Sequence, residues 1–343
     1  MIRIFILLSL LTLLILFIGC TTTPDPVYDE PQPAAEETTA EIIYEAIPDT
    51  NTNAISQLAA ALSSHEAVFE VTPIHLREFT IVALAEHAGL EPRGMVIYRI
   101  RYASDGYEVI GYVAAPDDFL EYEYPILVVN RGGNRTFGML SPEALINFAL
   151  RGYIVLASQY RGVAGGTGME QFGGDDINDV LRLIDISENF MFAQQGGVYM
   201  FGASRGGMMT YIASRMDNRI VAATVWAAIS NAFDSFNERE QAMQSVYIDL
   251  IGGTPEELPE EFERRSAVFW ADEINVPLLI GHGGDADWRV LTHHAINMAE
   301  ALERYGKPHR LIIYPDAGHG GEETNFLDEM DQWFRQHPIG EGS

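Results

Sequence analysis

The chain has 343 residues, one cysteine and a formal net charge of −28, from 21 basic and 49 acidic residues. This charge argues against a nucleic-acid partner, because no basic patch is available to neutralise phosphates, and a single cysteine excludes an internal disulfide. The hydrophobic content of 47% is that of a globular protein, and the length is sufficient for one large domain with a sizeable core.

The N-terminal segment MIRIFILLSLLTLLILFIGC has an apolar run over 4–18 and ends on Cys20. That length suits the hydrophobic part of an export signal and is marginal for a membrane span. The ending resembles a bacterial lipoprotein signal, which implies cleavage before Cys20 and a lipid anchor on its thiol. Phe17 stands where such signals usually have leucine, and the alternative is an uncleaved signal anchor. Both interpretations predict a membrane-anchored protein that faces away from the cytoplasm.

The part before the main domain divides into a signal peptide over 1–19, a flexible tether over 20–50 and an N-terminal extension over 51–92. The tether is rich in Pro, Thr, Glu and Ala, and it holds too little apolar surface to offset the entropy of ordering. Parts of the extension, AISQLAAALSSH and HLREFTIVALAEHA, have a helical pattern. We expect these helices to cover one edge of a sheet.

From residue 93 onward, strand-like and helix-like patterns follow one another. The strand-like runs are MVIYRIRYA, YEVIGYVAAP, YPILVVN, YIVLASQY, GVYMFGAS, AATVWAAI, VPLLIGHG and HRLIIYPD. The helix-like runs are SPEALINFALRG, DDINDVLRLIDISENF, SRGGMMTYIASRM, HHAINMAEALERYG and ETNFLDEMDQWFRQHP. The turn signal SDGY predicts that the first two strands pair antiparallel. The alternation after them predicts an α/β fold, an eight-stranded, mostly parallel sheet with helices on both faces.

The segment VYMFGASRGGMM is a strand-like run, then Gly202-Ala203-Ser204-Arg205-Gly206, then a helical run. This is the G-x-S-x-G pattern in the strand–turn–helix context that it requires. Ser204 on such a turn projects its hydroxyl above the sheet, at a helix N-terminus that favours negative charge. The N–H of Arg205 is then positioned to bind an oxyanion. The alternative is a glycine-rich turn without a catalytic role.

A serine nucleophile needs a base, and the chain has nine histidines. His319 stands in YPDAGHGG, directly after the last strand-like run. Loops at this end of the strands are where open α/β sheets gather their functional groups. His319 is therefore the predicted base, whereas most other histidines precede the sheet or lie on helical surface.

The base needs a carboxylate to orient it, and GHGGDADWRV offers both Asp285 and Asp287. Periodicity does not separate the two aspartates. A metal site built from His282, Asp285 and Asp287 is a further alternative. Such a site requires three or four converging ligands, and the sequence has no H-E-x-x-H type of pattern that would support it. We therefore expect no metal and no cofactor.

Six motifs follow one another over roughly 93–338, namely YASDGYEVIGYVAAP, YRGVAGGTG, FGGDDINDV, GASRGG, RRSAVFWADEINVPLLIGHGGDADWRV and DAGHG. In this order they resemble the α/β-hydrolase catalytic domain of the prolyl oligopeptidase family of serine peptidases. The resemblance implies a catalytic domain over 93–340 that cleaves amide or ester bonds of a peptide or small acyl substrate through an acyl-enzyme. The D-x-x-V element of the family falls on Asp287-Trp288-Arg289-Val290. It implies the triad Ser204, Asp287 and His319, with Asp285 as a turn residue.

Two departures from the family pattern limit what carries over. Larger members have a β-propeller before the catalytic domain, whereas about 70 residues without propeller repeats separate Cys20 from the sheet here. Peptide specificity therefore does not carry over. The strand before NRGGN also ends without the tyrosine that many members use as an oxyanion donor. An N–H around Arg131 and Gly132 or the Arg131 guanidinium could donate instead, or Arg131 could pair with a loop carboxylate.

Two other functions fit the same sequence. One is a carboxylesterase of the same fold without peptidase activity. The other is a lipid-anchored binding protein on a catalytically dead hydrolase fold, since a fold alone does not establish a function. The presence of a nucleophile, a carboxylate and a base in context favours an enzyme.

Overall fold

The computed structural model describes residues 51–321 and 324–340. The predicted signal, Cys20 and the tether therefore lie outside the described residues. Among the described residues, no helix is both long enough and apolar enough to span a membrane. The strands are β1 (Val68–Ile74), β2 (Met95–Ser104), β3 (Tyr107–Pro116), β4 (Ile126–Asn130), β5 (Ile154–Ser158), β6 (Val198–Ala203), β7 (Ile220–Trp226), β8 (Leu278–Gly283) and β9 (His309–Tyr314). The α-helices are α1 (Thr52–Ser64), α2 (Glu78–Ala88), α3 (Pro142–Leu150), α4 (Ile177–Ser187), α5 (Arg205–Met216), α6 (Ala232–Glu238), α7 (Gln241–Ile251), α8 (Pro259–Arg264), α9 (His293–Arg304) and α10 (Phe326–Gln336).

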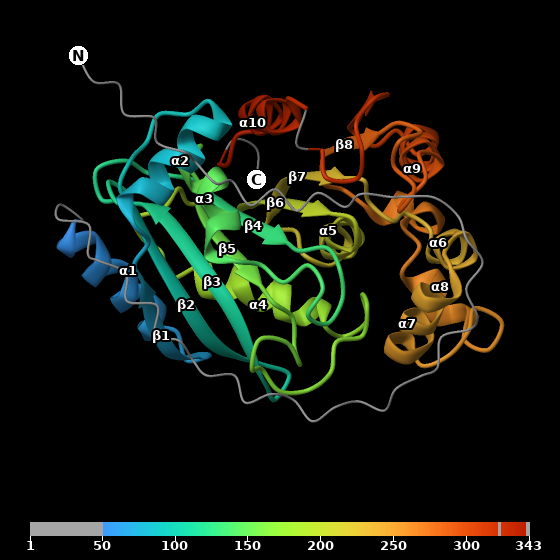
Figure 1. The fold of residues 1–343 in the computed structure, drawn as a ribbon, viewed down its shortest axis with the longest axis horizontal. Helices are drawn as coiled ribbons and strands as arrows, with labels where there is room; N and C mark the ends of the chain where they lie inside the picture. Colours follow the sequence, from blue (N-terminus) through green and yellow to red (C-terminus); the bar gives the residue numbers. More distant parts are fainter. Residues whose placement is uncertain (1–50, 322–323, 341–343) are drawn as a thin grey trace, which may run out of the picture. The chain divides into compact units, whose positions relative to one another are not determined.

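The strands form one sheet in the order β1-β2-β3-β5-β4-β6-β7-β8-β9 (Figure 1). β1, β2 and β3 pair antiparallel, β3 pairs antiparallel with β5, and the pairs from β5 through β9 are parallel. The turn between β2 and β3 has positive φ at Asp105 and Gly106, as a tight hairpin turn requires. The predicted mostly parallel α/β sheet and its antiparallel first pair are confirmed.

The sheet has nine strands where the sequence indicated eight. The additional strand, β1, lies in the segment 51–92, between the two helices α1 and α2 that the pattern predicted there. β1 forms one edge of the sheet, and only Val68 of its residues is buried. An edge strand with largely exposed side chains lacks the continuous apolar run of a central strand, which explains why the sequence pattern did not reveal it.

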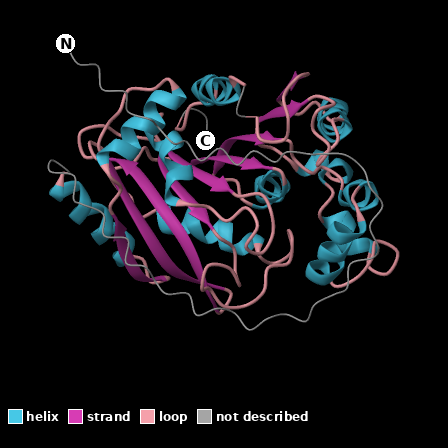
Figure 2. Ribbon diagram, in the orientation of Figure 1, coloured by secondary structure: helices cyan, strands magenta, loops and turns pink. Residues whose placement is uncertain are grey.

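Helices cover both faces of the sheet (Figure 2). Buried side chains of α1, α4, α5 and α9 belong to one hydrophobic cluster, and those of α2, α3 and α10 belong to a second cluster. Because both faces are covered, every residue of β4 and β5 is buried. This explains the continuous apolar runs of the central strands.

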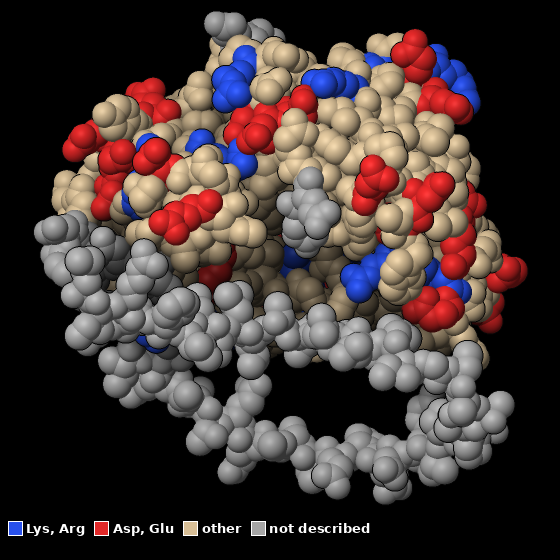
Figure 3. Space-filling model, turned by 45° about the horizontal axis from the view of Figure 1, so that its top comes forward, with Lys and Arg blue, Asp and Glu red and all other residues tan. Residues whose placement is uncertain are grey.

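The loops after the parallel strands bring distant segments together at one edge of the sheet. Ser204 follows β6, Asp287 follows β8 and His319 follows β9. The insertion between β7 and β8 forms α6, α7 and α8, to the right of the sheet in Figure 1. On the face shown in Figure 3, acidic side chains are scattered over the surface and basic side chains lie among them.

Candidate active site

Ser204 occupies a sharp turn between β6 and α5. Its backbone has φ 57° and ψ −124°, a conformation that residues other than glycine rarely adopt. The Ser204 N–H donates to the carbonyl of Trp226 at 2.9 Å, which fastens the turn to the end of β7. A Cβ on Gly206 would overlap the carbonyl oxygen of Asn130, so the second glycine of the motif allows α5 to pack against β4. The strand–turn–helix context predicted from the sequence is present.

His319 and Asp287 lie side by side although 32 residues separate them. His319 Nδ1 is 3.0 Å from Asp287 Oδ1 and 2.9 Å from Asp287 Oδ2. Asp287 is buried, and its Oδ1 also accepts the backbone N–H groups of Arg289 at 2.9 Å and Val290 at 3.2 Å. The carboxylate is thereby fixed in the loop and directed at the imidazole.

The surroundings of Asp287 keep it ionised. Burial disfavours its charge, but the hydrogen bond and charge of His319 and the two backbone N–H groups outweigh burial, so the pKa of Asp287 lies below its ordinary value. Asp285 is exposed, and no hydrogen bond to its carboxylate occurs among the described residues. Two backbone N–H groups of this loop donate to Asp287 and not to Asp285, the expected turn residue.

A cavity of about 410 Å³ contains Ser204 and His319. It is lined by Gly132, Gly133, Asn134, Phe137, Gly138, Phe172, Ala203, Ser204, Arg205, Trp226, Ile229, Arg239, Met243, Trp288, Arg289, Val290, His319 and Gly320. Arg239 and Met243 come from the insertion between β7 and β8. No hydrogen bond joins the Ser204 hydroxyl to His319 among the described residues, and such bonds often tighten only when substrate binds.

Of the three predicted oxyanion donors, Gly132 and Arg205 lie next to Ser204, whereas Arg131 does not line the cavity. Gly132 lies against the nucleophile, since a Cβ built on it would be 3.2 Å from Ser204 Cβ. The backbone of Arg205 begins α5 directly after Ser204. Arg131 does not line the cavity, because its guanidinium is buried and donates to the carbonyls of Gln159, Gly132, Phe137 and Arg135. It lies 3.5 Å from Glu170, so the structure has the pairing with a loop carboxylate and not a guanidinium donor in the cavity.

The three side chains of the metal alternative do not converge. His282 is buried with Nε2 3.9 Å from Asp287 Oδ2, and Asp285 is exposed. Burial lowers the pKa of His282, so this histidine is neutral at neutral pH. The metal interpretation of these three residues is therefore wrong.

A different set of potential ligands is Glu238, His293 and His294, whose ligand atoms lie within 4.8 Å of one another. Both histidines contact the Glu238 carboxylate through Nε2. His294 is buried although it lies on α9, and its Nδ1 accepts the N–H of Ser230 at 3.3 Å. This tautomer places a proton on His294 Nε2, so the cluster is satisfied by hydrogen bonds.

Sequence reasoning did not identify two further residues of the site. Arg289 lines the cavity, with its guanidinium carbon 5.4 Å from the Trp288 ring centroid and 5.8 Å from that of Phe137. Glu170 lies behind the cavity and contacts both Arg131 and Arg205. Arg289 lies inside the D-x-x-V element, so its position in this motif could have indicated that it belongs to the site. No sequence motif indicated a role for Glu170.

Comparison with known proteins identifies a family to which the chain is similar. The family model described as the prolyl oligopeptidase family matches residues 141–338. A Bacillus subtilis protein described as the uncharacterized peptidase YtmA is 30% identical over 243 residues, which covers 70% of this chain and 93% of that protein. Dipeptidyl-peptidase 5 of Porphyromonas gingivalis is 26% identical over 255 residues, which covers 68% of this chain and 37% of that protein.

Solved structures share the fold. An acylaminoacyl peptidase of Pyrococcus horikoshii matches with a TM-score of 0.61 at 20% identity, over 74% of this chain and 42% of that one. A puromycin-hydrolyzing peptidase of Mycobacterium tuberculosis matches with a TM-score of 0.60 at 23% identity, over 71% of this chain and 39% of that one. The chain spans less than half the length of these two proteins and of dipeptidyl-peptidase 5.

The shared fold confirms the α/β-hydrolase architecture. The family model covers more than half of the chain, and YtmA is related to it over most of both lengths. The chain therefore belongs to the prolyl oligopeptidase family and is a serine hydrolase.

Proposed function

We propose that this protein cleaves peptide bonds through an acyl-enzyme on Ser204, with His319 as general base and Asp287 as the carboxylate that orients it. The observation that carries the proposal is the contact of His319 Nδ1 with both oxygens of Asp287, at the wall of the cavity that contains Ser204. The strained turn at Ser204 supports the same assignment, because strain of this kind is concentrated at functional sites.

In this mechanism Ser204 Oγ attacks the substrate carbonyl while His319 Nε2 takes the hydroxyl proton. Asp287 fixes the proton of His319 on Nδ1 and stabilises the imidazolium that forms. The N–H groups of Arg205 and Gly132 hold the oxyanion, because both flank the nucleophile. His319 then protonates the leaving group, and water attacks the acyl-enzyme by the reverse sequence of proton transfers.

The activity is expected to fall as the pH is lowered through the mildly acidic range. The pKa of Asp287 is below its ordinary value, so this carboxylate stays ionised there, and the loss reports protonation of a histidine base. The measurement is kcat/KM against pH with a substrate that does not itself titrate. A rate that stays constant down to about pH 4 would be inconsistent with a histidine base.

Arg289 favours a peptide over a simple ester as substrate. Its guanidinium lines the cavity and forms no ion pair with the described residues, so its N–H groups are available to a substrate carbonyl. A peptide has a second carbonyl beyond the scissile bond, whereas a short acyl ester does not. Arg289 therefore gives the peptide an additional charge-assisted hydrogen bond.

Replacing Arg289 by glutamine is expected to lower kcat/KM for a blocked peptide amide by about tenfold to a hundredfold, the effect of losing one hydrogen bond to a charged group. Turnover of a short acyl ester should change by less than about threefold. R304Q is the matched control, since Arg304 is an exposed arginine on α9. Equal losses on both substrates, or efficient turnover of the ester with none of the amide, would favour the carboxylesterase alternative.

A further inference from the structure

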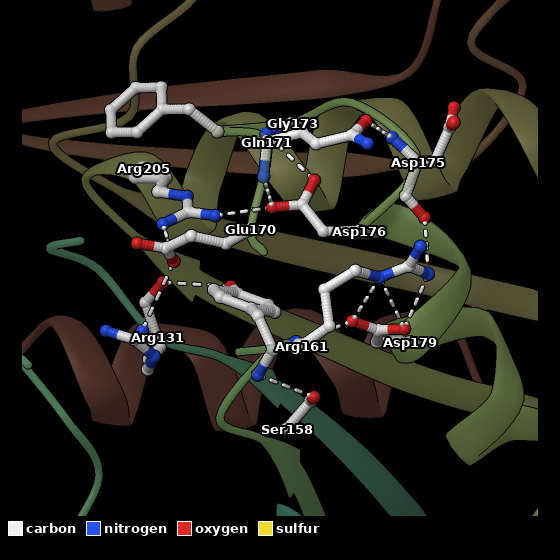
Figure 4. A network of polar contacts seen from close by, with 12 residues as sticks. Arg131, Ser158, Arg161, Glu170, Gln171, Gly173, Asp175, Asp176, Asp179 and Arg205 are labelled. Atoms are coloured by element: carbon white, nitrogen blue, oxygen red, sulfur yellow. Dashed lines mark hydrogen bonds and ion pairs between the residues drawn. The ribbon is translucent and has the colours of Figure 1, made fainter. Parts of the chain in front are cut away.

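Four buried charged side chains lie beside the proposed oxyanion donors (Figure 4). Arg131, Arg205, Glu170 and Asp176 have side chains that are at most 3% exposed. Their formal charges cancel within the cluster, although the whole chain carries −28. Burying charges is costly unless they are well paired, so this cluster is not explained by the stability of the core alone.

Glu170 is the member that connects two separate segments. Its Oε1 accepts the backbone N–H of Arg135, in the loop that follows β4. Its Oε2 accepts Arg205 Nη1 at 2.6 Å and lies 3.5 Å from Arg131 Nη2. One carboxylate therefore holds both the loop after β4 and the side chain of the residue that follows Ser204.

The guanidinium of Arg205 is held through its two terminal nitrogens and by two aromatic rings, whereas its buried Nε has no hydrogen-bond partner among the described residues. Its Nη2 donates to Asp176 at 2.6 Å and its Nη1 also donates to the carbonyl of Gly133 at 3.2 Å. The guanidinium carbon lies 4.6 Å from the Tyr160 ring centroid and 4.8 Å from that of Phe172. The burial and these contacts restrict the side chain, which extends from the first turn of α5.

The two connected segments carry the two proposed oxyanion donors. Gly132 belongs to the loop after β4, and Arg131 holds that loop by donating to the carbonyl of Gly132 at 3.1 Å. The Arg205 N–H belongs to the turn at Ser204. An oxyanion is stabilised only when both donors lie about 2.7–3.1 Å from it, so the spacing of these two segments decides the strength of the site.

We propose that Glu170 is a positioning residue that sets the spacing of the two halves of the oxyanion hole. The inference rests on the proposed function. Glu170 does not line the cavity around Ser204 and acts through Arg135 and Arg205. A carboxylate is required because both of its oxygens accept from N–H donors. A glutamine would turn an NH₂ group toward one of those donors and push the two segments apart.

The test compares E170Q and E170D with D179N. Asp179 is a matched control, since it is a fully buried carboxylate that pairs with Arg161 at 2.7 Å outside the oxyanion loop (Figure 4). Each variant is checked for folding by thermal unfolding and circular dichroism. The measured quantities are kcat, KM and the inhibition constant of a boronate matched to the best wild-type substrate, because its tetrahedral adduct places an oxygen in the oxyanion hole.

For E170Q we expect kcat to fall by about tenfold to a hundredfold, somewhat less than removal of an oxyanion donor, while KM changes by less than about threefold. The inhibition constant of the boronate should rise by the same factor as kcat falls. E170D keeps the charge but is too short to reach both segments, so it should show the same pattern. D179N should lose thermal stability with kcat within about threefold of the wild type.

The inference is overturned if a folded E170Q or E170D binds the boronate as the wild type does, or if D179N loses kcat to the same extent. Failure of both Glu170 variants to fold would also overturn it, because Glu170 would then be a stabilising residue only. A wild-type protein that neither turns over substrate nor binds any boronate would instead refute the proposed function.

Discussion

Replacement of Ser204 by alanine is expected to abolish turnover and covalent labelling by a fluorophosphonate probe. The hydroxyl of Ser204 is the only group in the proposed mechanism that forms a covalent bond to substrate, and its removal from a serine hydrolase typically lowers kcat by about 10⁶-fold. The measurements are substrate turnover and labelling followed by intact mass. The alanine variant should keep the thermal stability, because alanine retains the Cβ of this strained turn and the Ser204 hydroxyl forms no hydrogen bond with the described residues.

S56A is the control for this experiment. Ser56 lies on α1, and among the residues that the structure describes its hydroxyl bonds only to the carbonyl of Thr52 in the same helix. This variant should be labelled at the wild-type rate. Undiminished labelling of folded S204A would refute the assignment of the nucleophile and favour the catalytically dead binding protein or a nucleophile elsewhere.

The second large effect is expected at the two neighbouring aspartates. Replacing Asp287 by asparagine should lower kcat by about 10⁴-fold, because an amide presents the wrong partner to His319 Nδ1 and stabilises the wrong imidazole tautomer. Replacing Asp285 by asparagine should change kcat by less than about threefold, since this carboxylate is exposed and has no contact with His319. Each variant serves as the control of the other, because the substitutions are chemically identical and two positions apart.

A larger loss of kcat in the Asp285 variant than in the Asp287 variant would show that the loop after β8 adopts another register in the active enzyme. Equal, small effects at both positions would mean that a different group orients the base. His282 is another titratable side chain close to this carboxylate, with Nε2 3.9 Å from Asp287 Oδ2. A histidine side chain is neutral or positively charged, so it cannot supply the negative charge that the mechanism requires.

Much of the fold was predictable because the central strands are buried on both faces. β4 and β5 are apolar at almost every position for that reason, and the helical runs between the strands have recognisable starts. β1 was not predictable in this way, since it joins the sheet by pairing with β2 and only one of its seven residues is buried. The predicted strand count was therefore one short of the nine observed, because β1 lacks an apolar pattern of its own.

The predicted nucleophile and base lie in local motifs at strand ends, so their positions followed from short stretches of sequence. The choice between Asp285 and Asp287 came only from the spacing of the family motif, because both occupy the same loop. The partners of Arg131 were beyond sequence reasoning for a physical reason. The contacts among Arg131, Glu170 and Arg205 join segments more than 30 residues apart, and no local periodicity encodes such a pairing.

The central claim, an acyl-enzyme on Ser204, is tested most directly by locating the site of covalent modification. Wild-type protein is reacted with a fluorophosphonate probe until turnover stops, digested and mapped by mass spectrometry. We predict one adduct per chain, on the peptide that contains Ser204, with its formation matching the loss of activity. An adduct on another serine, or turnover that continues after full modification of Ser204, would contradict the mechanism.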